Sequence, residues 1–186
     1  ALLMRDALDE VFYRSSKSHP ISLVIGGGGF TGCELAGELA LFIGDLCDAH
    51  GHPPELVSLT VVEAGPKLLG PLDPWTQDKA LKRLSKLGVK IMCNAMITGV
   101  QENSLTLKDG SVIPFDMMMW TAGVKASELT HALSGVNVQK NSCLTVDKFL
   151  RVLPYENVFA VGDVSYCVDE KTGRPLPMTA SVAEHE

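Results

Sequence analysis

Closely spaced glycines near the start of the chain could bind a phosphate group. Gly27, Gly29 and Gly32 have the spacing G-x-G-x-x-G, and the apolar run 23–25 precedes them. In such a motif the first glycine permits a tight turn, the second lets a pyrophosphate approach, and the third lets a helix pack closely on a strand. The N–H groups at the start of the helix then bind the pyrophosphate. The spacing predicts a dinucleotide site; a plain glycine turn is the alternative.

A carboxylate at the end of a second apolar run would complete this site. Glu63 follows the β-branched run 58–62, where an acidic side chain binds the adenosine ribose of a dinucleotide. The usual gap is about 20 residues, and residues 44–56 lengthen it here. A carboxylate accepts a hydrogen bond from a ribose hydroxyl and repels a 2′-phosphate, so Glu63 favours NAD(H) over NADP(H), although Lys67 lies nearby. A surface acid at a strand end is the alternative reading of Glu63.

The elements that must position these residues alternate as in an α/β protein. Residues 21–25 are predicted to form a strand, and a helix with an apolar face follows the glycines. Asp73 and Pro74 are typical of the start of a second helix, and Gly88 is typical of its end. Residues 89–92 then form a third strand. This alternation predicts a parallel sheet.

The pattern then changes to short strands with tight turns. Three strands are predicted in a row, at 96–101, 104–108 and 111–115, with Asp109-Gly110 as a hairpin turn. Residues 116–120 are too apolar for a surface strand and indicate a buried return to the parallel sheet. Residues 121–123 leave the sheet at its carboxyl edge, where ligands of open α/β sheets bind. The expected fold class is α/β: a Rossmann-like parallel sheet with helices on both faces and an antiparallel β-meander, plus part of another domain.

Composition narrows the classes of partner. The 186 residues are 46% hydrophobic and carry a net charge of −6, without a basic stripe, so no nucleic-acid partner is expected. No apolar run approaches the roughly 20 residues of a membrane-spanning helix. The five cysteines are scattered and odd in number, without the spacing of a metal site. Reduced thiols in a reducing compartment, and no bound metal, are therefore expected.

Four ordered motifs resemble those of type II NADH dehydrogenases, which are single-subunit flavoproteins of the pyridine nucleotide-disulfide oxidoreductase superfamily. The motifs are GGGFTGCELAGEL at 27–39, WTAGVKAS at 120–127, VFAVGD at 158–163 and LPMTA at 176–180. The resemblance spans essentially the whole chain and implies a fragment of such an enzyme. It implies that residues 1–20 are a connecting helix and linker, 21–123 the NAD(H)-binding domain, and 124–186 part of the FAD-binding domain.

The resemblance also assigns residues to each cofactor. The residues expected to bind NADH are Gly27, Gly28, Gly29, Phe30, Thr31, Gly32, Glu34, Glu63, Ala122 and Gly123. Those expected to bind FAD are Gly162, Asp163, Thr179 and Ala180. The Asp163 carboxylate would accept hydrogen bonds from the ribityl chain, and an ordinary turn aspartate is the alternative.

The resemblance also implies one catalytic residue, and the sequence departs from the family pattern at two positions. Glu34 matches a glutamate near the nicotinamide and the flavin that would relay protons to quinone; a solvated acid near the start of a helix is the alternative. The family usually places glutamines that line the quinone site after the Thr-Ala pair. Ser181 and His185 stand at those places here, which weakens the quinone assignment.

The activity implied is that of an FAD-dependent NADH dehydrogenase that passes a hydride from NADH to FAD and electrons on to a quinone-type acceptor. Two alternatives stay open: the NAD(H)-binding domain of a ferredoxin or disulfide reductase, and a non-catalytic NADH-binding module. The isolated chain is expected to be inactive. Peripheral attachment to a bacterial cytoplasmic or mitochondrial inner membrane, through regions outside this chain, and a homodimer are compatible with the resemblance.

Overall fold

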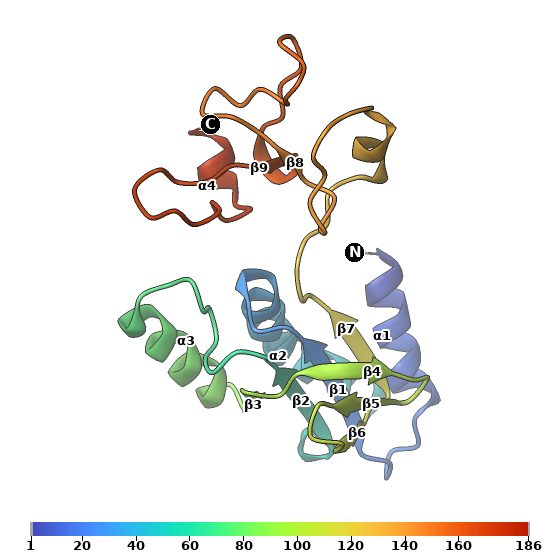
Figure 1. Ribbon diagram of the computed structural model, residues 1–186. Coiled ribbons are helices and arrows are strands. Elements are labelled where there is room, and N and C mark those ends of the chain that lie inside the picture. Colours follow the sequence, from blue (N-terminus) through green and yellow to red (C-terminus); the bar gives the residue numbers. More distant parts are fainter. Residues whose placement is uncertain (1, 186) are drawn as a thin grey trace. The chain divides into compact units, whose positions relative to one another are not determined.

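The computed structural model describes residues 2–185, which divide into two compact units between Gly123 and Val124 (Figure 1). The first unit is α/β, with one parallel and one antiparallel sheet. The expected α/β class, with a parallel sheet and an antiparallel β-meander, is thereby confirmed. Among the described residues, no helix has both the length and the apolar character needed to cross a membrane.

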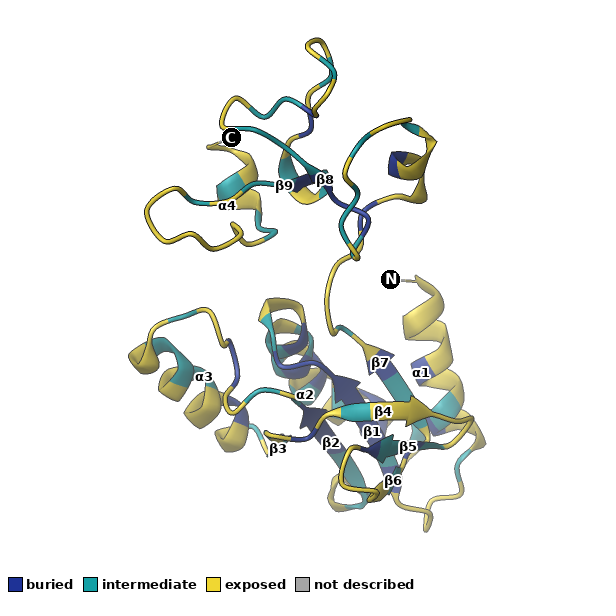
Figure 2. Ribbon diagram, viewed as in Figure 1, coloured by how far each residue is buried: buried dark blue, intermediate teal, exposed yellow. Residues whose placement is uncertain are grey.

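A four-stranded parallel sheet forms the centre of the first unit. Its order is β3-β2-β1-β7, and its strands are β1 (Ile21–Gly26), β2 (Val57–Val62), β3 (Lys90–Met92) and β7 (Met117–Trp120). Strand β1 lies between two neighbours, with Gly26 opposite both Val62 and Trp120 in the register. It is therefore almost completely buried (Figure 2).

Helices cover one face of this sheet. They are α1 (Leu2–Arg14), α2 (Phe30–His50) and α3 (Pro74–Lys86), and their apolar residues join Leu23 and Ile25 in one core. Helix α1 contributes Phe12, which is 1% exposed and meets the His52 ring edge-on, with 5.8 Å between ring centroids. Helix α1 thus docks on the same unit as the glycine turn.

The β-meander covers the opposite face. It comprises β4 (Ile97–Val100), β5 (Ser104–Leu107) and β6 (Val112–Pro114), paired antiparallel, and its apolar residues pack against Val24 and Val62. The meander therefore occupies a face where the sequence pattern had predicted helices. The reason is that the chain crosses the sheet between β3 and β7 through these short strands instead of a helix.

Strand β7 returns to the sheet as expected and pairs parallel to β1, but it is less buried than predicted. Met119 is buried, whereas Trp120 is 60% exposed. Strand β7 has only one neighbour among the described strands. An apolar sequence on this strand therefore does not produce full burial.

The second unit has little regular structure. It contains the short strands β8 (Leu144–Thr145) and β9 (Ser165–Tyr166), helix α4 (Ala180–Ala183) and the 3₁₀ turns η2 (Glu128–Ala132) and η3 (Gly162–Val164). A small core of Leu144, Val152 and Ala160 holds these pieces together.

Candidate functional site

A cavity of about 500 Å³ lies at the carboxyl ends of the central strands. Its wall includes Gly27, Gly28, Gly29, Glu63, Gly70, Pro71, Met96, Ile97, Trp120, Thr121, Ala122 and Gly123. Six of the ten residues expected to bind NADH are in this wall. Phe30, Thr31, Gly32 and Glu34 are not, since they belong to the first turns of α2.

The three glycines of the motif have different surroundings. Gly27 has a φ of +110°, and a Cβ there would lie 2.8 Å from Ala122 Cα. A Cβ on Gly32 would lie only 1.9 Å from the carbonyl oxygen of Gly27, so the start of α2 packs directly on the turn. Gly29 has open space, because nothing lies within 4 Å of the position of its Cβ. The turn is thus closed on the protein side and open on the cavity side.

The N-terminus of α2 offers donors to this open side. Gly29 is the N-cap residue, and no side chain caps the helix there. The first N–H groups of a helix have no partner within the helix and carry a positive partial charge. An anion that enters beside Gly29 would meet these groups.

Glu63 connects the end of β2 to the glycine turn. Its Oε2 accepts a hydrogen bond from the Gly28 N–H at 2.6 Å, and its Oε1 accepts one from the Gly65 N–H at 2.6 Å. Glu63 also lines the cavity. Glu63 therefore has a structural task that the sequence pattern did not reveal, beside the ribose contact predicted from it.

Thr121 was missed as a site residue, although it lies inside the motif WTAGVKAS. Its backbone N–H donates to Gly26 O at 2.8 Å, and its hydroxyl lies 3.1 Å from both Gly26 O and Gly27 O. The Thr121 side chain therefore links the end of β7 to the turn after β1 by hydrogen bonds. Its position directly before Ala122 and Gly123 was the available signal.

Cys33 was also missed. Its thiol donates to Gly28 O at 3.4 Å, directly behind the turn. Burial raises the pKa of Cys33 to about 11, helped by the charge of Glu63. Burial and Glu63 also raise the pKa of Cys93. Both thiols are therefore protonated at neutral pH, and the Cys33 thiol acts as a donor.

Glu34 is exposed on the surface of α2 and does not line the cavity. Within residues 2–123 the Glu34 carboxylate has no hydrogen-bond or ion-pair partner. A role for Glu34 in proton relay stays a prediction.

The residues expected to bind FAD lie in the second unit. Gly162 has a φ of +66° and begins η3, which also contains Asp163. The buried Cys143 thiol donates to Asp163 O at 3.3 Å and so fixes this turn. Thr179 caps α4 through its hydroxyl, which accepts from the Val182 N–H at 3.4 Å, directly before Ala180.

Ser181 and His185, the two departures from the family pattern, contact their own helix end. The Ser181 hydroxyl lies 3.2 Å from the Thr179 hydroxyl, and the His185 Nδ1 lies 2.6 Å from Ser181 O. Both side chains are exposed or nearly so, and these contacts assign them no chemistry.

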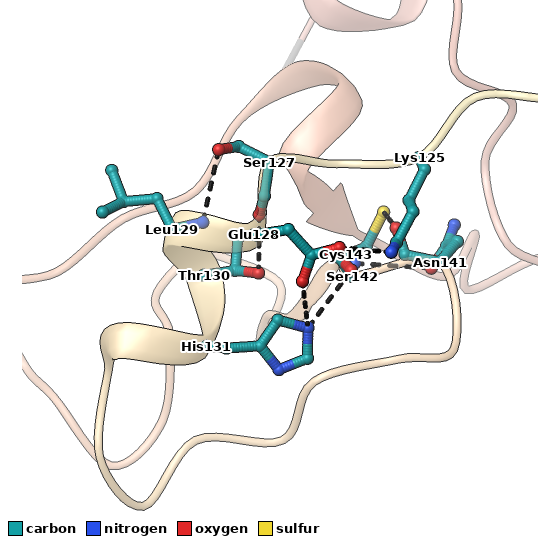
Figure 3. A network of polar contacts seen from close by, with 9 residues as sticks. All are labelled: Lys125, Ser127, Glu128, Leu129, Thr130, His131, Asn141, Ser142 and Cys143. Carbon is teal, nitrogen blue, oxygen red and sulfur yellow. Dashed lines mark hydrogen bonds and ion pairs between the residues drawn. The ribbon is translucent and has the colours of Figure 1, made fainter.

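A polar network near η2 supports the second unit (Figure 3). Lys125 pairs with Glu128, and His131 Nε2 lies 3.6 Å from Glu128 Oε2 and 3.2 Å from Ser142 Oγ. Ser142 is 1% exposed with a φ of +65°. One imidazole nitrogen makes both histidine contacts, so this is no Ser-His-acid relay, in which the two nitrogens have separate partners. The network holds the 125–131 segment against the loop that carries Cys143.

Comparison with known proteins gives consistent matches. The family model of the pyridine nucleotide-disulphide oxidoreductases matches residues 4–186. The type II NADH:quinone oxidoreductase of Haemophilus influenzae is 32% identical over 95% of this chain and 41% of its own length. The mitochondrial internal alternative NAD(P)H-ubiquinone oxidoreductase A1 of Arabidopsis thaliana is 31% identical over 100% of this chain and 36% of its own length.

A solved structure shares the fold. NDH2 from Plasmodium falciparum in complex with NADH matches with a TM-score of 0.77 and 23% identity, over 89% of this chain and 37% of that one. Together these matches confirm the resemblance to type II NADH dehydrogenases that the four motifs indicated. The chain spans about two fifths of the length of the curated relatives it matches.

Proposed function

Because the chain belongs to the pyridine nucleotide-disulphide oxidoreductase family, we propose that its first unit is the NADH-binding part of an FAD-dependent NADH dehydrogenase. The observation that carries this proposal is the glycine turn. It is sealed by Gly32 on one side, open at Gly29 on the other, and adjoins an uncapped helix N-terminus. A pyrophosphate fits such a place in both shape and charge.

The residues around the turn suggest how NADH would bind. The pyrophosphate would lie against Gly28 and Gly29, and the adenosine ribose would lie at Glu63. Each Glu63 oxygen has a lone pair beyond the one that accepts a backbone N–H, so a ribose hydroxyl could still donate to it. Ala122 and Gly123 would offer backbone groups to the other half of the dinucleotide. Phe30, Thr31 and Gly32 would contribute through the helix start.

The second unit would supply part of the FAD site through Gly162, Asp163, Thr179 and Ala180. The positive φ of Gly162 and the Cys143 contact set the turn on which the Asp163 carboxylate stands. That carboxylate is a suitable acceptor for sugar hydroxyls. When bound, FAD would accept the hydride of NADH and pass electrons to a quinone-type acceptor.

The relatives' names support the quinone as acceptor, since they are NADH:quinone and NAD(P)H-ubiquinone oxidoreductases. We also propose that the protein attaches peripherally to a bacterial cytoplasmic or mitochondrial inner membrane and forms a homodimer. The proposal also includes proton relay by Glu34 toward the quinone.

A competition titration tests the proposed function. NADH fluorescence should rise and saturate as the 186-residue chain is added, and excess ADP-ribose should reverse the rise. ADP-ribose contains the pyrophosphate and the adenosine ribose but lacks the nicotinamide. Failure of ADP-ribose to compete would contradict the glycine turn as the binding place. Full-length protein containing this chain should copurify with FAD and oxidise NADH with a soluble quinone; a flavin-free protein would contradict the enzyme class.

A further inference from the structure

The loop between β2 and α3 is a wall of the cavity and also holds the glycine turn. We define the cover loop as residues 65–72. The Leu69 N–H donates to Gly28 O at 2.8 Å, and Gly70 and Pro71 line the cavity. The buried Leu68 side chain presses on the turn, because a Cβ on Gly28 would lie 2.5 Å from its Cδ2. The cover loop thus fixes the carbonyl end of Gly28, while Glu63 fixes its N–H.

The backbone of the cover loop needs an outside support. Leu69 has a φ of 52°, in the left-handed region, although it has a branched side chain. Residues with bulky side chains rarely occupy this region unless their surroundings hold them there. The Leu72 N–H donates to Leu69 O at 2.8 Å, which closes the loop on itself. At the other end of the loop the Asn94 N–H donates to Gly65 O at 2.8 Å. The Gly70 and Leu72 carbonyls, on the carboxyl side, accept no backbone N–H within residues 2–185.

The Gln77 side chain supplies that support from α3. Its Nε2 lies 2.9 Å from Leu72 O, 3.2 Å from Gly70 O and 3.4 Å from Leu69 O. An amide nitrogen has two N–H groups, so the two shorter contacts are the principal hydrogen bonds. The Gln77 side-chain amide thus contacts three backbone carbonyls on the carboxyl side of the cover loop.

Helix α3 is a firm base for this side chain. The Asp73 Oδ1 accepts from both the Trp75 and the Thr76 N–H groups at 3.0 Å, and its Oδ2 accepts from the Thr76 hydroxyl at 2.6 Å. The Gln77 N–H also donates to Asp73 O at 3.1 Å. The helix start is therefore well capped, directly after the cover loop and directly before Gln77.

We propose that Gln77 is a positioning residue for the dinucleotide site. It holds the cover loop, and through Leu69 it fixes the Gly28 peptide against which the pyrophosphate would lie. This inference rests on the proposed function, since it assigns a remote support to that same site. Gln77 is not in the cavity wall, so its effect on NADH has to pass through the loop.

The test compares two glutamines of the first unit. Gln77→Met keeps the charge and approximate length of the side chain but removes both N–H donors. Gln101→Met is the matched control, because Gln101 is exposed in the β4–β5 turn and its side chain makes no hydrogen bond within residues 2–185. We measure the dissociation constant for NADH, the thermal unfolding midpoint, and amide hydrogen exchange at Leu69 and Ile25 in the 186-residue chain.

Gln77→Met should weaken NADH at least fivefold and speed exchange of the Leu69 amide at least tenfold. The Ile25 amide of β1 and the unfolding midpoint should stay as in the wild type, and Gln101→Met should bind NADH within twofold of it. An NADH affinity within twofold of wild type in Gln77→Met would overturn the positioning role and leave the proposed function intact. Equal acceleration at Leu69 and Ile25 would reduce Gln77 to a general stabiliser and overturn the role too. A wild-type chain that binds no NADH would instead contradict the proposed function itself.

Discussion

The Glu63 carboxylate accepts a hydrogen bond from the Gly28 N–H at 2.6 Å and so ties the end of β2 to the turn after β1. The two residues are 35 positions apart, yet they form one unit of the candidate site. The same carboxylate that would recognise the ribose also sets the peptide that would face the pyrophosphate. Loss of Glu63 therefore affects both parts of a dinucleotide.

Glu63→Gln should raise the dissociation constant for NADH about tenfold or more. An amide keeps the shape of the side chain but turns one acceptor into a donor, which then faces a backbone N–H at Gly28 or Gly65. A hydrogen bond to a charged group contributes about 1.5–3 kcal/mol, which corresponds to roughly tenfold or more in affinity. Calorimetry measures the change, with the exposed Glu102→Gln as control. Unchanged NADH affinity would show that Glu63 neither binds the ribose nor positions the Gly28 peptide for the pyrophosphate.

Gly29→Val and Gly32→Ala should fail in different ways. At Gly29 a side chain enters open space with an ordinary φ of −76°, so the fold should survive while NADH binding is lost. At Gly32 a Cβ meets Gly27 O at 1.9 Å, so the free energy of unfolding should fall by about 2 kcal/mol or more. Urea unfolding and an NADH titration separate the two effects. Binding of NADH by Gly29→Val would contradict the place assigned to the pyrophosphate.

Thr121→Val should weaken NADH several-fold while changing the side-chain volume little. The variant removes the hydroxyl that contacts Gly26 O and Gly27 O at 3.1 Å. The side-chain link between the end of β7 and the glycine turn is then lost. Thr98→Val is the matched control, because the Thr98 hydroxyl contacts Thr106 O at 3.2 Å within the meander. Equal NADH affinities for the two variants would argue against a positioning role for Thr121.

Cys33 should resist alkylation at neutral and mildly alkaline pH. Its pKa is raised from 9.0 to about 11, so its thiolate fraction at pH 8 is about a hundredfold below that of an ordinary cysteine. Folding favours the protonated thiol; this stabilisation is therefore fully present below pH 9 and is lost as the pH rises through about 11. Iodoacetamide labelling of the folded chain, followed by mass spectrometry between pH 7 and pH 11, measures this. Rapid labelling of Cys33 at pH 8 in folded protein would contradict the raised pKa.

Strand β1, the glycine turn and helix α2 could be predicted from local sequence. The glycine spacing and the apolar periodicity that indicate them extend over about 15 residues. The hairpin at Gly110 was also predictable, and Gly110 has the positive φ of 86° that such a turn requires. Glu63 could be placed because strand ends of a parallel sheet meet at one edge. Its bond to Gly28 could not, since it depends on the exact approach of two loops.

The remaining features depend on contacts between distant segments. The left-handed backbone of Leu69 has no sequence signal, because leucine ordinarily avoids that region. Trp75, in the first turn of α3, is 69% exposed, with the Lys79 ammonium 5.2 Å from its ring centroid. Leu84, further along α3, is the buried residue of this helix. The residues typical of helix ends, Asp73, Pro74 and Gly88, predicted this helix, but they do not indicate which of its turns packs in the core.

The most direct test of the account is calorimetric titration of the 186-residue chain with NADH and with NADPH, with FAD added in a parallel cell. The account predicts saturable binding of one NADH, much weaker binding of NADPH because Glu63 repels a 2′-phosphate, and no uptake of FAD. Absence of binding by either nucleotide would contradict the glycine turn as a dinucleotide site in this chain. Tighter binding of NADPH than of NADH would contradict the role assigned to Glu63.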